Sequence, residues 1–167
     1  MGLFDMFKSD AGATMTPHMA FVVSLYYIMA ADGAFENEEI GVLLTVLGGE
    51  KQGNVIGVGA QNKALLDASI KYAKGHSVEQ FLAEATPLLT DAQKMCILIN
   101  LVDVSLADGE ADPSEQVIFD KILRSFGISE ERFRPFFEVV VLKNDRTVFT
   151  NPNNPKNAPG FQVRLTT

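Results

Sequence analysis

Two related stretches, ADGAFENEE at residues 31–39 and ADGEADPSE at residues 107–115, decide how the chain folds. Each follows a long apolar run, opens with Ala-Asp-Gly, and carries a glutamate seven residues after its aspartate. A shift of 76 residues superposes them, so we name them the first and second acidic corners. The duplication predicts two helix–corner–helix repeats, at about residues 16–48 and 90–127, that pack together as a pseudo-symmetric pair.

The runs that lead into the corners are typical of central helices, because residues 19–31 and 95–106 are apolar at nearly every position. Their starts are also marked, by Thr16-Pro17 in the first run and by Thr90 with Gln93 in the second. Further helices are expected at about residues 37–47, 61–74, 77–85, 112–126 and from 129 onward. Ser77 with Gln80 marks the start of one of them, and Asp112 before Pro113 is the predicted N-cap of another. The pattern as a whole predicts an all-α single domain of about seven helices.

The helical domain is expected to span residues 15–142, between an N-terminal lead at 1–14 and a C-terminal tail at 143–167. Apolar residues at 139–142 and 147–149 flank a polar pair, Asn-Asp, at the start of the tail. Such a pattern favours either an extended tail or a short hairpin.

Composition narrows the classes of partner and the compartment. The net charge is −7, from 21 acidic and 14 basic residues. This balance argues against a nucleic-acid partner, because a protein that binds nucleic acid needs a basic face. The single cysteine, Cys96, permits no intrachain disulfide and fits a reducing compartment. Its apolar neighbours predict a buried, unreactive thiol. The start of the chain lacks a signal-peptide pattern, and residues 19–31 are too short to span a bilayer, so a cytoplasmic location is expected.

The corners resemble the second half of a calcium-binding EF-hand loop, in which Asp-Gly precedes a glutamate. An EF-hand also needs oxygen ligands at its first and third positions. Those positions are apolar in both copies: Ile28, Ala30, Val104 and Leu106. EF-hands are therefore excluded.

Two interpretations of the acidic residues remain open. Carboxylates in the first turn of a helix accept backbone N–H groups and complement the helix dipole, so both corners can be simple helix caps. The same acidic spacing in two places also favours a divalent-cation site, and an all-oxygen ligand set favours calcium, magnesium or manganese over zinc. The candidate metal ligands are Asp32, Glu36, Glu39, Asp108, Asp112 and Glu115.

No spacing of Ser, His, Asp or Cys suggests a nucleophile with its base, so no catalytic or cofactor-binding residue is predicted and the chain is not expected to be an enzyme. A metal-dependent hydrolase is the least favoured alternative. Asn100 and Asp103 share a face of an apolar helix, as a buried polar pair or as a third contributor to the site; we favour the buried pair.

The two corners, together with Phe126-Gly127-Ile128-Ser129 after the second, resemble the TerB family, named for tellurite resistance and similar to a domain of DjlA-type co-chaperones. The resemblance covers about residues 15–142. It implies a two-repeat helical fold and metal-binding acidic residues at Asp32, Glu39, Asp108 and Glu115, with Glu36 and Asp112 as weaker matches. It also implies partners among other tellurite-resistance and stress-response proteins, including one at the inner face of the membrane. The competing hypothesis is a metal-free interaction scaffold. Neither hypothesis specifies an oligomeric state.

Overall fold

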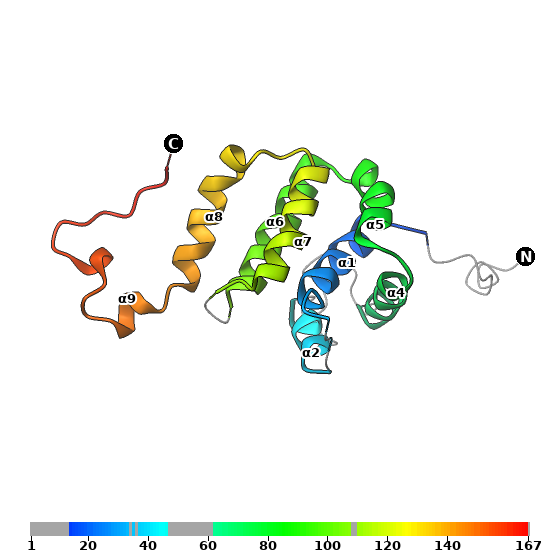
Figure 1. Ribbon diagram of the computed structural model, residues 1–167, viewed down its shortest axis with the longest axis horizontal. Helices are drawn as coiled ribbons and strands as arrows, with labels where there is room; N and C mark the ends of the chain where they lie inside the picture. The colour runs from blue at the N-terminus through cyan, green and yellow to red at the C-terminus, as the bar shows by residue number, and fades with distance from the viewer. Residues whose placement is uncertain (1–13, 34, 36, 47–61, 108–109, 167) are drawn as a thin grey trace, which may run out of the picture.

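The computed structural model describes residues 14–33, 35, 37–46, 62–107 and 110–166, and all regular structure in them is helical (Figure 1). The α-helices are α1 (Pro17–Met29), α2 (Asn37–Val46), α4 (Asn62–Gly75), α5 (Val78–Ala85), α6 (Asp91–Leu106), α7 (Pro113–Ser125), α8 (Glu130–Asn144) and α9 (Thr147–Thr150). Short 3₁₀ turns follow α5 at Thr86–Leu88 and α9 at Pro155–Asn157. The predicted all-α fold class is confirmed.

Helix α1 forms the centre of the domain. Every residue from Met19 to Met29 is buried, because α4 packs along one side of the helix and α6 along the other (Figure 1). Ser24 is the one serine in this stretch, and its hydroxyl donates a hydrogen bond to the carbonyl of Ala20 at 2.7 Å, within the helix. A helix that is apolar on all sides is thus placed where no side faces water.

The predicted repeat is visible in the helix boundaries. Under the shift of 76 residues, α1 and α2 coincide with α6 and α7 to within three residues at each end. The predicted helix starts are also confirmed. Thr16 caps α1, and capping boxes at Ser77 with Gln80 and at Thr90 with Gln93 open α5 and α6. Helices α1 and α6 both run downward in Figure 1 and end on the same side of the molecule, where the chain enters the two corners.

Of the two alternatives for the start of the tail, the hairpin is wrong. Residues 139–142 belong to α8, and Thr147–Thr150 form α9. Helix α8 continues through this region because Val140 is buried against the core, and the Asn144 amide donates to the Val140 carbonyl at 3.0 Å. Beyond α9 the chain turns back toward α8, where the backbone N–H of Thr166 donates to Glu138 Oε2 at 2.8 Å.

Helix α8 packs mainly against α6, and Asp103 is one of two carboxylates on α6, with Asp91, that bind side chains of α8. Asp103 on α6 accepts hydrogen bonds from Lys143 Nζ at 2.7 Å and from Asn144 Nδ2 at 2.9 Å. The predicted buried pair of Asn100 and Asp103 is therefore wrong. Asn100 instead donates to the Cys96 carbonyl at 2.8 Å, and both side chains are only half-buried.

Replacing Asp103 with asparagine is expected to weaken the attachment of α8 in a pH-dependent way. Burial alone would raise the pKa of Asp103, but the hydrogen bonds from Lys143 and Asn144 and the charge of Lys143 outweigh it, so the pKa lies below its usual 3.8. The carboxylate therefore stabilises the fold above its unfolded-state pKa, and this contribution disappears as pH falls through the lower folded-state pKa.

Urea unfolding of the wild type and Asp103→Asn at neutral pH and in acid checks this expectation. The difference between the two proteins should shrink as pH falls below 3.8. The exposed Asp67 on α4 supplies the control, since Asp67→Asn should change the free energy of unfolding by no more than about 0.5 kcal/mol. An Asp103→Asn deficit of the same size at both pH values would contradict the argument.

The predicted N-terminal lead, residues 1–14, lies almost wholly outside the described residues. Among the helices that the structure describes, none is long and apolar enough to cross a membrane.

Candidate acidic-corner site

The first corner leaves α1 through a tight turn. The N–H of Gly33 donates to the Ala30 carbonyl at 3.0 Å, and Gly33 has a φ of 88°, a conformation that glycine adopts without the strain of a Cβ. Asp32 is exposed at this turn. Phe35 then folds back onto the end of α1, with its ring centroid 4.5 Å from that of Tyr26. The contact between Phe35 and Tyr26 thus packs the first corner against α1.

Glu39 follows on α2 and is half-buried. Burial raises the pKa of the Tyr26 hydroxyl, and the negative charge of Glu39 raises it further, which places this carboxylate on the α1 side of α2. The third candidate ligand of this corner, Glu36, lies outside the described residues.

The second corner is a helix cap. Asp112 is the N-cap of α7, and its Oδ1 accepts the N–H of Ser114 at 2.8 Å. The N–H of Asp112 in turn donates to Glu115 Oε2 at 2.8 Å, which completes a capping box. Hydrogen bonds from the hydroxyl and the N–H of Ser114 hold the pKa of Asp112 below its usual range. The cap that the sequence predicts at Asp112 is therefore confirmed.

Four of the six candidate metal ligands lie among the described residues: Asp32, Glu39, Asp112 and Glu115. Asp108, like Glu36, lies outside the described residues. Within the described part of the chain, no three Asp, Glu, His or Cys side chains gather closely enough to hold a metal ion. Asp112 and Glu115 also each direct one oxygen at a backbone N–H. The described carboxylates therefore do not form a preassembled cation site, and metal ligation stays a prediction for the set as a whole.

A pocket that the sequence analysis did not predict opens beside the second corner. It has a volume of about 500 Å³ and lies between α6, α7 and α8. Its apolar lining comes from all three helices: Val102 and Leu106, Phe119, and Phe137. Glu110, Glu115 and Asp120 add carboxylates to the same lining. The corner thus combines an acidic rim with an open apolar surface.

The thiol of Cys96 is exposed, contrary to the predicted burial. Its neighbours Met95, Ile97 and Leu98 are buried, but Cys96 lies on the outer side of α6. Helix α8 covers this side only in part, and Phe136 of α8 lines a hollow there together with Cys96. Apolar neighbours along the sequence did not reveal which side of the helix would be left uncovered.

Fold and site together define a helical two-repeat domain with acidic corners. The family model for tellurite resistance protein TerB matches residues 18–136, which include both repeats and both corners. The chain belongs to the TerB family, as its sequence motifs indicated. Searches among curated proteins and among solved structures gave no significant match.

Proposed function

We propose that the chain is a non-enzymatic docking module that works with other tellurite-resistance or stress-response proteins. The observation that carries this proposal is the open pocket at the second corner, where apolar side chains of three helices remain accessible. A concave, mainly apolar lining with a few polar groups is the usual form of a binding site. Family membership supplies the biological setting, and it agrees with action in the cytoplasm or, through a membrane-bound partner, at the inner face of the membrane.

The chemistry of the pocket favours binding over catalysis. The side chains lining its described part are apolar residues, carboxylates, an amide and the serine Ser105, with no histidine or cysteine among them. Ser105 is buried and has no histidine beside it in that lining to activate its hydroxyl. A broad phosphatase and esterase screen of the purified chain is expected to show no turnover, and activity that survives repurification would overturn the non-enzymatic part of the proposal.

Co-purification tests the docking role. A tagged chain is expressed in its own cells, with and without tellurite, and bound proteins are crosslinked and identified by mass spectrometry. We expect tellurite-resistance or stress-response proteins to be enriched over a tag-only control. Recovery of the chain alone under both conditions would contradict the proposal.

Divalent-cation binding is the second candidate function. The observation that favours it is that α1 and α6, the helices that lead into the two corners, end on the same side of the molecule (Figure 1), while the net charge of −7 favours cations in general. On this hypothesis, calorimetric titration with calcium, magnesium or manganese gives saturable heat, and zinc binds no better. Asp32→Asn and Asp108→Asn should each reduce that heat. Titrations without heat, and a melting temperature that no cation shifts, would reject it.

A further inference from the structure

Several residues that line the pocket at the second corner have bulkier counterparts in the first repeat. Under the shift of 76 residues, three residues that line the pocket correspond to larger residues of the first repeat. The pairs, larger residue first, are Tyr26 and Val102, Met29 and Ser105, and Phe35 and Ala111. Three other lining residues, Leu106, Glu110 and Phe119, are instead larger than their counterparts. The second repeat therefore loses bulk specifically at the positions of Val102, Ser105 and Ala111.

The first repeat also shows what kind of group fills such a space. Tyr26 and Met29 are buried, and the ring of Phe35 lies against Tyr26 with 4.5 Å between centroids. Phe35 reaches this position from the corner itself, directly before α2. An aromatic side chain entering from the corner is thus the group that this arrangement accommodates.

The rim of the pocket at the second corner is negatively charged and favours a positively charged partner. Glu110 and Asp120 are exposed, and Glu115 lies half-buried in the same lining. Among the described residues that line the pocket, none is basic. The whole chain has a net charge of −7, which reinforces the local potential. Lysine or arginine beside the entering aromatic group would complement this rim.

We infer that the pocket receives one aromatic side chain of a partner protein, from a segment in which lysine or arginine flanks that residue. The inference rests on the proposed docking function and adds the chemistry of the partner to it. Val102, Leu106, Phe119 and Phe137 supply apolar contacts to the ring, and the acidic rim binds the flanking cations. Buried aromatic anchors contribute much of the affinity at protein interfaces, so the ring is the main determinant of binding.

A synthetic peptide with one phenylalanine between lysine pairs, labelled for fluorescence anisotropy, is the probe. We expect saturable binding that weakens at least about tenfold when alanine replaces the phenylalanine, and again when glutamates replace the lysines. Binding should also weaken with salt, since the charges at the rim are exposed. No binding of the parent peptide, or equal binding of the alanine peptide, would overturn the inference.

Pocket-filling variants locate the site. Ala111→Phe and Ser105→Met restore residues of the first repeat, and each is expected to reduce peptide binding at least about tenfold while the circular dichroism spectrum stays native. Should either variant fail to fold, the surface change Asp120→Lys still tests the rim. Val117 is the matched control, because it is exposed on α7 and does not line the pocket, so Val117→Ser should bind as wild type. Unchanged binding by the folded filling variants would exclude this pocket.

Repeating the co-purification with Ala111→Phe separates the two proposals. Loss of partners together with loss of peptide binding supports both. Partners that remain on a folded Ala111→Phe chain would overturn the pocket as the docking site while leaving the docking function intact. A chain that recovers no partner in any form contradicts the docking function itself.

Discussion

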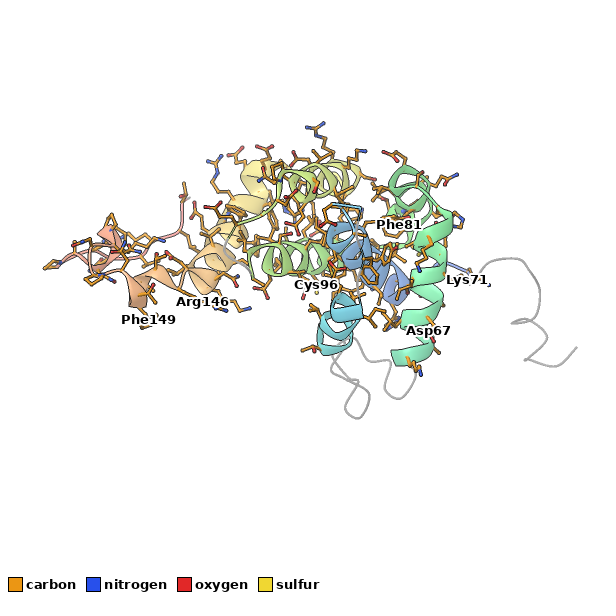
Figure 2. All side chains as sticks on the ribbon, turned by 60° about the horizontal axis from the view of Figure 1, so that its bottom comes forward. Asp67, Lys71, Phe81, Cys96, Arg146 and Phe149 are labelled. Atoms are coloured by element: carbon orange, nitrogen blue, oxygen red, sulfur yellow. The ribbon has the colours of Figure 1, made fainter. Side chains whose placement is uncertain are left out.

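Replacing Phe81 with alanine is expected to lower the free energy of unfolding by about 3–5 kcal/mol. Phe81 comes from α5 and is fully buried where α5 meets α1 and α4 (Figure 2). Its ring centroid lies 5.5 Å from that of Tyr27 and 6.4 Å from that of Tyr72. Truncation removes these contacts and leaves a cavity that three helices cannot close without moving the central helix.

Chemical denaturation monitored by circular dichroism gives the measurement. Phe149 is the matched control, because it projects from α9 with 93% of its surface exposed, and Phe149→Ala should change stability by no more than about 0.5 kcal/mol (Figure 2). Phe81→Leu should lose clearly less than Phe81→Ala, since it keeps most of the buried volume. Equal losses for Phe81→Ala and Phe149→Ala would show that α5 does not anchor the core as described.

The helical repeats were predictable because their signals are local. Capping residues such as Ser77 and Thr90 mark where helices start, and apolar residues on every side of α1 indicate that the helix is central. The hairpin prediction failed because the β-branched valines at 139–141 have a local strand preference that packing overrides. Burial of Val140 against the core favours the helix, and a contact of that kind is not encoded by neighbours in the sequence.

The candidate site was predictable only in part. The position of Asp112 before a proline predicts an N-cap, and that local feature is confirmed. The pocket depends on how α8 lies over α6, which no short-range pattern specifies. A signal was nevertheless present in the duplication, because alanine and serine at 111 and 105 stand where the first repeat has phenylalanine and methionine. Comparison of residue sizes between the repeats, as well as acidic positions, would have pointed to it.

The two roles left open for the second corner differ most clearly at Asp112. As a cap, Asp112 accepts the N–H of Ser114 through Oδ1, and its own N–H is bound by Glu115. Asp112→Ala removes that acceptor and is expected to lower the melting temperature by about 2–4 °C. Asp112→Ser keeps a capping oxygen without the carboxylate and should restore most of the loss, because serine is a comparable N-cap.

Melting each variant with and without calcium, magnesium and manganese separates a cap from a ligand. If Asp112 acts only as a cap, serine can replace it. No cation then changes the order of the melting temperatures of the wild type, Asp112→Ser and Asp112→Ala. If Asp112 is a ligand, cations stabilise the wild type, and alanine and serine abolish that gain equally, because neither supplies a carboxylate. We expect the first pattern, since both Asp112 and Glu115 direct an oxygen at the backbone of the first turn of α7. A cation-dependent gain that Asp112→Ser loses would contradict the cap-only role and make the corner a metal site.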